Sequence, residues 1–343
     1  MRIALVAPPW YAIPPEGYGG IEWVVALLAD GLTDRGHDVT LYAPPGSQTK
    51  ARLVSPLPQA PSPETVGNPW WEASHALDAY DEVEGFDLLH DHMGPVGVAI
   101  GALSAAQTVH TLHGPFVEET SMLYRRVARH HWFVAISERQ RSQAPPGLRW
   151  AGVVYNGIPV DRYPYRQDKD DYLLFMGRVD DEKAPDLAVE AANRAGRRLV
   201  MCVTTKNERE RRYWAEKVEP LLSDRVDVRG ECGHEEKAEL LAGAAALLFP
   251  VQWEEPFGLV MPEAMACGTP VVAWRNGAVP EVVEDGVTGF VVDSMDDFVR
   301  AIDRVGELDP RACRDVVERR FSGDAMVEGY LEAYRRALAG EDG

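Results

Sequence analysis

Two glutamates in the last third of the chain have the type and spacing of a ligand site. Glu255 and Glu263 stand on either side of a Phe-Gly turn, eight positions apart. Pro262 suits the first turn of a helix, so we expect Glu263 at a helix start, where a carboxylate is favoured, and Glu255 in the preceding loop at the mouth of a cleft. Ionised carboxylates only accept hydrogen bonds, so such a pair suits a hydroxyl-rich ligand such as a sugar and a ribose. The alternative is a helix-capping glutamate and a solvated loop glutamate.

Two cations upstream could hold an anionic ligand. Arg178 and Lys183 follow the strand-like run Tyr172–Met176 within a few residues of each other. Arginine offers a planar fork of donors, and lysine offers a point charge. A site that stabilises a departing diphosphate without a metal needs such cations together with backbone donors. The alternative interpretation is two solvated surface cations.

A glycine-rich turn, Gly17-Tyr18-Gly19-Gly20, lies before a helix predicted to begin at Ile21. Glycine lets backbone N–H groups approach a phosphate closely, and a helix N-terminus adds a favourable dipole. The turn is not a G-x-G-x-x-G fingerprint, so by itself it is weak evidence. The alternative is a turn that binds no ligand.

Strands and helices that alternate along the whole chain must position these residues. Short apolar runs alternate with amphipathic segments, which is typical of parallel sheets covered on both faces. We therefore predict an α/β protein with two Rossmann-like, doubly wound domains facing across a cleft, residues 1–160 and 161–322. Ligands are expected at the carboxyl ends of the strands.

Individual elements follow from the same pattern. The helix predicted over Ile21–Arg35 is expected to end at Gly36, and Pro44–Pro69, rich in Pro and Ser, is predicted to be a long surface loop. The predicted strands are Arg2–Ala7, Asp38–Tyr42, Asp87–His90, Gln107–Leu112, Trp132–Ile136, Gly152–Tyr155, Tyr172–Met176, Leu199–Thr204, Val226–Val228, Ala246–Pro250, Pro270–Trp274 and Gly289–Val292. The further predicted helices are Asp186–Ala195, Glu208–Leu222, Glu235–Ala245, Pro310–Arg320 and Asp324–Leu338.

Composition limits the class of protein. The 343 residues are 45% hydrophobic and 26% charged, as in an ordinary globular protein, and the formal net charge is -19. That charge argues against a nucleic-acid binder and against association with an anionic membrane surface. No apolar run approaches the ~20 residues of a membrane span. The four cysteines are scattered, which favours reduced thiols in a cytoplasm.

With these motifs in place, the chain resembles the retaining, nucleotide-sugar-dependent glycosyltransferases of family four (glycosyltransferase group 1), which have the GT-B fold. The resemblance covers nearly the whole chain and is densest over residues 247–292. The matching strings there are Glu255-Pro256-Phe257-Gly258-Leu259, Glu263-Ala264-Met265-Ala266, Gly268-Thr269-Pro270-Val271-Val272, Pro280-Glu281-Val282 and Asp285-Gly286-Val287-Thr288-Gly289. Further matches are Phe175-Met176-Gly177-Arg178 followed by Lys183, Val154-Tyr155-Asn156-Gly157-Ile158 and, more weakly, Gly19-Gly20 and Thr111-Leu112-His113-Gly114.

The resemblance implies roles for the donor side. Arg178 and Lys183 would contact the phosphates, Glu263 the ribose hydroxyls, and Glu255 the transferred sugar. Three further backbones, those of Phe257, Gly258 and Leu259, would approach sugar hydroxyls and phosphate. Gly19 and Gly20 would touch the donor phosphate from the N-terminal domain, the base would lie near residues 229–234, and a helix over 323–340 would cross back onto the N-terminal domain.

Histidines raise the question of a metal. His113 follows an apolar strand, and the resemblance implies a place at the reaction centre, whereas a core or loop histidine is the alternative. His90-Asp91-His92 lacks a third and fourth ligand, so we expect it to be a strand-end loop lining the acceptor side. Asp168-Lys169-Asp170 formally matches a DxD metal motif but lies in a charged linker. We therefore predict no metal site.

Together these features predict a cytoplasmic enzyme that transfers a sugar from a UDP-, GDP- or dTDP-sugar to a hydroxyl, without metal or prosthetic group. No carboxylate pair presents a nucleophile on the opposite face, so the departing diphosphate itself would accept the acceptor's proton. The acidic chain favours a small soluble acceptor, such as a glycoside or natural product, over a lipid. The candidate acceptor wall is Pro44–Tyr80, with Trp70 and Trp71, although a packed loop cluster is equally consistent.

Other functions remain open at this point. An NDP-sugar epimerase or hydrolase on the same scaffold would lack an acceptor pocket. A nucleotide-sugar-binding module would bind the donor without turnover. A Rossmann dehydrogenase is disfavoured because no G-x-G-x-x-G follows a strand.

Overall fold

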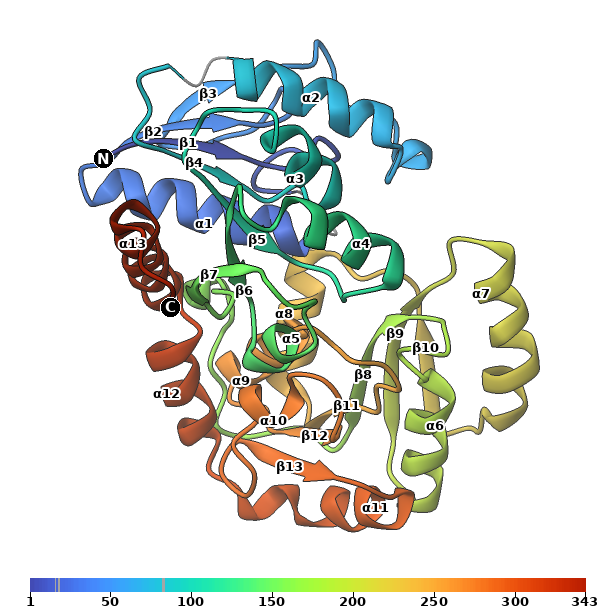
Figure 1. Cartoon of the computed structure of the whole chain (residues 1–343). Coiled ribbons are helices and arrows are strands. Elements are labelled where there is room, and N and C mark those ends of the chain that lie inside the picture. The colour runs from blue at the N-terminus through green and yellow to red at the C-terminus, as the bar shows by residue number, and fades with distance from the viewer. Residues whose placement is uncertain (16, 18, 82–83) are drawn as a thin grey trace. The chain divides into compact units, whose positions relative to one another are not determined.

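The computed structural model describes residues 1–15, 17, 19–81 and 84–343. The chain divides into two compact units (Figure 1): unit 1 is Met1–Pro159 with Ser322–Gly343, and unit 2 is Val160–Phe321. Each unit is built on one sheet whose strand pairs are all parallel. The predicted α/β class with two doubly wound parallel sheets is confirmed. No helix of the described residues is long and apolar enough to cross a membrane.

Unit 1 contains a seven-stranded sheet in the order β3-β2-β1-β4-β5-β6-β7. Its strands are β1 (Arg2–Val6), β2 (Asp38–Tyr42), β3 (Arg52–Val54), β4 (Leu88–Asp91), β5 (Thr108–Leu112), β6 (Trp132–Ala135) and β7 (Arg149–Val153). Its helices are α1 (Gly20–Asp34), α2 (Pro69–Asp81), α3 (Pro95–Gly101), α4 (Glu118–Val127), α5 (Glu138–Ser142) and α13 (Gly323–Ala339).

The first strand shows how this sheet is covered on both faces. Side chains alternate along a strand, so Ile3 and Leu5 pack with α1 and α13, whereas Ala4 and Val6 pack with α2. Helix α13 returns from the end of the chain and lies beside α1 (Figure 1). A Cβ at Gly31 of α1 would be only 2.7 Å from Val327 of α13, so glycine permits this close approach.

Two expectations for unit 1 are wrong. The segment Pro44–Pro69 is not one long loop, because it contains the edge strand β3 and reaches the start of α2. His90 and Asp91 do not lie in a strand-end loop, because they are the last residues of β4 and both are fully buried. By contrast, the predicted end of α1 is confirmed, since Gly36 has φ of 80° and donates from its N–H to Thr33.

Unit 2 contains a six-stranded sheet in the order β10-β9-β8-β11-β12-β13. Its strands are β8 (Leu173–Arg178), β9 (Leu199–Thr204), β10 (Val226–Arg229), β11 (Ala246–Phe249), β12 (Val271–Trp274) and β13 (Gly289–Val292). Its helices are α6 (Pro185–Arg194), α7 (Glu208–Tyr213), α8 (His234–Gly243), α9 (Val260–Ala266), α10 (Val279–Val282), α11 (Met295–Arg304) and α12 (Pro310–Arg320).

Strand order determines where each unit can bind a ligand. In unit 1 the chain direction of the crossovers reverses between β1 and β4, and in unit 2 it reverses between β8 and β11. At such a reversal the loops beyond the carboxyl ends of the strands diverge and leave a crevice. The loops after β8 and β11 carry Lys183 and Glu255, and the loop after β4 begins at His92.

Candidate active site

The loops after β8 and β11 are joined by an ion pair between Lys183 and Glu255. Lys183 Nζ contacts Glu255 Oε2, which also accepts a hydrogen bond of 3.0 Å from Nε1 of Trp253. The two side chains are only 19% and 9% exposed, so water screens the pair weakly. The Lys183 ammonium also lies 5.2 Å from the ring centre of Trp253, within the range of a cation–π interaction.

Arg178 ends β8 and is held by two carboxylates of the following loop. Its NH2 nitrogen is 3.2 Å from Asp180 and 3.2 Å from Glu182. The Arg178 side chain is 40% exposed, so it can exchange these partners for a ligand. Asp180 also accepts a 2.8 Å hydrogen bond from the backbone N–H of Lys183, which fixes the loop between the two cations.

The Glu255 loop requires a glycine that the sequence pattern does not single out. Gly277 lies so close to this loop that a Cβ there would be 2.3 Å from both the N and O atoms of Glu255. Its φ of 56° also favours glycine. The backbone O of Glu255 accepts a 2.8 Å hydrogen bond from Ala278. The loop after β12 thus holds the backbone of Glu255 from the far side.

Glu263 lies on α9 and is held at both carboxylate oxygens. Tyr163 Oη donates a 2.8 Å hydrogen bond to Oε1, and Lys237 Nζ is 2.6 Å from Oε2. Glu263 is 8% exposed. Burial, and then the neighbouring Glu263 carboxylate, raise the pKa of Tyr163 far above its usual range, so the phenol stays a hydrogen-bond donor. The carboxylate is therefore oriented before any ligand arrives.

The sequence pattern does not single out either supporting residue, Tyr163 or Lys237. Tyr163 is 100 positions from Glu263, and Lys237 comes from α8, so only the folded chain brings them together. Tyr163 is itself fixed, because its carbonyl accepts a 2.8 Å hydrogen bond from Arg314 and its ring meets His234 edge-on. The sequence signal is weak, because Tyr163 is one of two tyrosines, with Tyr165, in a linker that is rich in charged residues.

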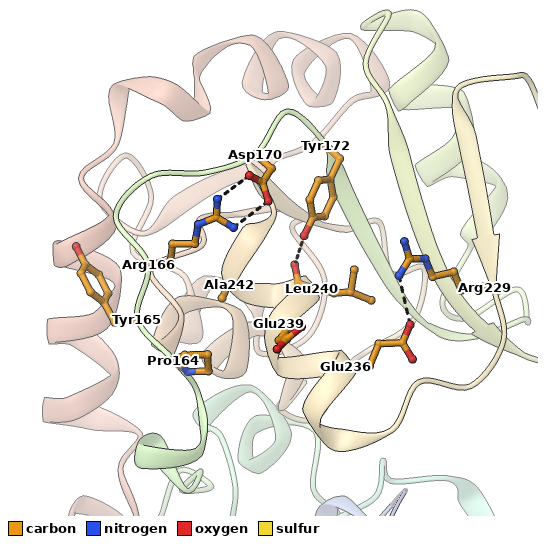
Figure 2. Close-up of a pocket in the computed structure, with 10 residues that line it drawn as sticks. All are labelled: Pro164, Tyr165, Arg166, Asp170, Tyr172, Arg229, Glu236, Glu239, Leu240 and Ala242. Carbon is orange, nitrogen blue, oxygen red and sulfur yellow. Dashed lines mark hydrogen bonds and ion pairs between the residues drawn. The ribbon is translucent and has the colours of Figure 1, made fainter.

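A cavity of about 480 Å³ lies beside α8 in unit 2. Figure 2 shows two ion pairs on its walls, Arg166 with Asp170 and Arg229 with Glu236. The hydroxyl of Tyr172 donates a 2.8 Å hydrogen bond to the carbonyl of Leu240 between them (Figure 2). The residues predicted to hold the donor phosphates and sugars, Arg178, Lys183, Glu255 and Glu263, do not line this cavity. Of residues 229–234, the segment predicted to lie near the base, only Arg229 lines it.

In unit 1 the described part of the glycine-rich turn leads directly into α1. Gly19 must be glycine, because a Cβ there would lie 2.8 Å from Pro15 and 2.9 Å from Glu22. Tyr18 lies outside the described residues, and Gly20 is the first residue of α1. Glu22 is 5% exposed, and burial raises the pKa of its carboxyl to about 7. A carboxyl that is partly protonated at neutral pH therefore lies at this helix start.

His113 follows β5 and forms a hydrogen bond with another histidine. Its Nε2 is 2.9 Å from Nδ1 of His92, and burial lowers the pKa of His113 to about 4. His113 is partly exposed, whereas His92 is 2% exposed. His90 has a different role, since Nδ1 bonds Tyr334 at 2.7 Å and Nε2 bonds Thr111 at 2.8 Å within the interior of unit 1.

The described residues contain no group of three or more His, Cys, Asp or Glu that could hold a metal ion. In unit 2 the structure brings Lys183 to Glu255, and it gives Arg178 and Glu263 their own partners in the same unit. Phe257, Gly258 and Leu259 immediately precede α9. Phe257 is 2% exposed, and Gly258 has φ of 81°, so this turn is tightly packed and depends on its glycine.

Comparison with known proteins matches both halves of the chain to glycosyltransferase families. Residues 161–319 match the family described as Glycosyl transferases group 1, and residues 18–162 match the family described as Glycosyltransferase Family 4. A D-inositol 3-phosphate glycosyltransferase from Acidothermus cellulolyticus is 27% identical over 98% of this chain and 91% of its own.

Two solved structures extend the comparison. AviGT4, a glycosyltransferase involved in avilamycin A biosynthesis, is 29% identical with a TM-score of 0.73, and the match covers 99% of this chain and 98% of AviGT4. Anabaena Alr3699/HepE in complex with UDP and glucose is 18% identical with a TM-score of 0.72, over 98% of this chain and 99% of that one. The second likeness shows the fold alone.

Proposed function

The chain belongs to the group 1 glycosyltransferases of family 4, and from this premise we propose that it transfers a sugar from a nucleotide diphosphate sugar to a hydroxyl of a small acceptor, with retention at the anomeric carbon. The observation that supports donor binding in unit 2 is the ion pair between Lys183 and Glu255, on the loops after β8 and β11. These loops diverge at the crevice where ligands bind in sheets of this kind. Lys183 and Arg178 supply the cations that a leaving diphosphate needs.

In this proposal, each of the two glutamates binds a different part of the donor. Glu263, already oriented by Tyr163 and Lys237, accepts hydrogen bonds from the ribose hydroxyls. Glu255 accepts hydrogen bonds from the transferred sugar, and Lys183 turns from Glu255 toward the diphosphate when the donor binds. The backbone N–H groups around Gly258, and those at Gly19 and Gly20, approach phosphate oxygens.

Retention results because the acceptor hydroxyl attacks the same face of the sugar that the diphosphate leaves, and the diphosphate takes up the acceptor's proton. As the glycosidic C–O bond breaks, the diphosphate oxygen gains negative charge on the same face that the acceptor hydroxyl attacks. That oxygen accepts the hydroxyl proton while the new C–O bond forms, so no protein nucleophile is required. Arg178 and Lys183 stabilise the charge on the diphosphate during this step, and His113 is the residue proposed to contact the transferred sugar.

The relatives support candidate substrates. HepE in complex with UDP and glucose makes UDP-glucose the first donor to test. The D-inositol 3-phosphate glycosyltransferase supports a polyol phosphate as acceptor, and AviGT4, which is involved in avilamycin A biosynthesis, supports a natural product. The four cysteines, which are all free thiols in the structure, support a cytoplasmic location.

The test measures transfer with and without a chelator. Purified protein is incubated with UDP-, GDP- or dTDP-glucose and inositol phosphate or glycoside acceptors, and glycoside product and released nucleotide are quantified. We expect product with the α-anomeric configuration of the donor, and activity that is retained in excess EDTA. Strict dependence on a divalent ion would contradict the cation-only mechanism. Equal nucleotide release with and without acceptors would instead identify a hydrolase.

A further inference from the structure

The contact between His92 and His113 in unit 1 is not explained by packing alone. His92 Nδ1 lies 2.9 Å from His113 Nε2, and the two rings stack with centroids 5.2 Å apart and planes inclined by 24°. His92 is 2% exposed, and its Nε2 has no hydrogen-bond partner among the described residues. The imidazole of the buried His92 therefore makes its one hydrogen bond with described residues to His113, which is partly exposed.

The ring of His92 is held in place from behind. The backbone N–H of His92 donates a 2.9 Å hydrogen bond to Val6 of β1, and its ring centre lies 4.1 Å from that of His90. His90 is in turn fixed by Tyr334 and Thr111. His92 thus has little freedom to turn away from His113.

One proton lies between the two rings, and burial indicates which ring carries it. Burial lowers the pKa of His92 well below its usual value and that of His113 to about 4, so both imidazoles are neutral near pH 7. If His113 donated, His92 would carry its hydrogen on the buried Nε2, where no described residue accepts it. If His92 donates, only a lone pair stays unpaired at that position. Orphaned buried N–H groups are rarer than under-satisfied acceptors, so donation by His92 is favoured.

We propose that His92 is a positioning residue that fixes the tautomer of His113 for the transfer reaction. By donating from Nδ1 to Nε2 of His113, it leaves the hydrogen of His113 on Nδ1, because the hydrogen bond at one ring nitrogen determines the state of the other. No described residue is a partner of His113 Nδ1. This N–H is then offered to a hydroxyl oxygen of the sugar or the acceptor. The inference rests on the proposed function, in which His113 faces the reacting sugar.

Two substitutions separate the hydrogen bond from the packing. His92→Phe keeps a ring of similar size and removes both nitrogens, whereas His92→Asn retains an amide nitrogen near the position of Nδ1. We expect His92→Phe to lower kcat/KM by about 10- to 100-fold, as when partners that orient metal-bound histidines are removed. We expect His92→Asn to recover kcat/KM to within about fivefold of the parent, by the same reasoning. Equal losses in the two variants would overturn the proposal.

A double-mutant cycle and a control complete the activity test. In a His113→Ala background, His92→Phe should change kcat/KM by less than about twofold, because its effect passes through His113. A full loss in that background would overturn the proposal. The control is His131→Phe, which removes a histidine that is 1% exposed, immediately precedes β6 of the same unit and packs against His110 rather than His113. It should leave kcat/KM within about twofold of the parent.

Nitrogen-15 NMR of the histidines in the 343-residue chain tests the tautomer without any turnover. We expect the His113 signals to show hydrogen on Nδ1 and a bare, hydrogen-bonded Nε2, and His92→Phe should shift the Nε2 signal. Hydrogen on Nε2 of His113 would overturn the inference. Since this spectrum requires no substrate, it distinguishes a wrong assignment of His92 from a failure of the proposed function, in which the parent protein would transfer no sugar.

Discussion

The carboxylate of Glu263 is oriented by Tyr163 and Lys237, which suits it to accept hydrogen bonds from the two ribose hydroxyls in the proposed function. We expect Glu263→Gln to raise donor KM about tenfold or more with kcat changed less than about threefold, because hydrogen bonds to a charged group contribute about 1.5–3 kcal/mol. The amide keeps an acceptor for Tyr163 but loses the anion that pairs with Lys237. Initial rates at varied donor concentration measure both constants.

Tyr163→Phe is the matched control for that prediction. It removes one 2.8 Å hydrogen bond to Glu263 while the carboxylate keeps its charge. We expect donor KM to rise by only about two- to fivefold, in line with about 1 kcal/mol for such a bond. An unchanged donor KM in Glu263→Gln would show that Glu263 does not contact the ribose.

Glu22 gives a prediction about pH. Burial raises the pKa of Glu22 from 4.5 to about 7, so between these values the folded chain binds more protons than the unfolded chain. The stabilising contribution is therefore complete below pH 4.5 and is lost as the pH rises through 7. At about 1.36 kcal/mol per pKa unit, Glu22→Gln should gain up to about 3 kcal/mol over the parent at pH 8.

Urea unfolding between pH 5 and pH 8 measures this difference. The free energy of unfolding of Glu22→Gln should rise relative to the parent as the pH increases. Glu119→Gln, at an exposed position of α4, should show no such trend. A constant difference between Glu22→Gln and the parent across this range would contradict a buried, partly protonated Glu22.

At the scale of elements, strong local patterns were predictable and weak ones were not. Helix α1 has a continuous apolar stripe and is terminated by Gly36, two residues beyond its last residue Asp34, so both its existence and its end follow from the sequence. Strand β3 has three half-exposed or exposed residues in a Pro- and Ser-rich stretch, so it shows no alternation. Helix α2 buries His75, Ala76, Ala79 and Tyr80, a face too small and polar to give a helical period.

In the candidate site, too, the residues of a local motif could be predicted, whereas contacts between distant segments could not. Glu255 and Glu263 lie in one short motif, so their order along the chain shows that they belong together. The contacts of Glu263 with Tyr163 and of His113 with His92 depend on elements that meet only after folding. A single sequence does not show which distant residues meet, so neither the pairing of Tyr163 with Glu263 nor that of His92 with His113 could be predicted.

Helix α13 completes the interior of unit 1 through polar as well as apolar contacts. Tyr334 bonds His90 at 2.7 Å, and both side chains are fully buried. Tyr334→Phe leaves His90 Nδ1 without its partner, which should lower the free energy of unfolding by about 1–3 kcal/mol. Thermal denaturation measures this loss, with Leu338→Ala, at a 44% exposed position of the same helix, expected within about 0.5 kcal/mol of the parent. A Tm equal to that of the parent would show that the hydroxyl is dispensable.

Considered as a whole, the molecule carries a net charge of -19, which repels an anionic donor at long range. Binding must therefore depend on a few cations placed at short range, and Arg178, Lys183 and Lys237 are all in unit 2. Each is paired with a carboxylate in the structure, so the donor must replace at least one of these partners. Under the proposed function, this local exchange confines the pairing of donor charge with cations to unit 2.

Hydrogen–deuterium exchange can locate donor binding along the entire chain. With UDP at 100 times its Kd, a binding unit gains about 2.7 kcal/mol of stability against opening. If the cations of unit 2 hold the diphosphate and Glu263 the ribose, slower exchange should concentrate in residues 178–186, 229–237 and 255–267. A Lys183→Met variant should lose most of this protection at the same UDP concentration, because the ammonium that pairs with Glu255 is gone. Protection confined to unit 1, or equal protection in Lys183→Met, would show that the nucleotide binds elsewhere and that the Lys183–Glu255 pair serves only to hold two loops together.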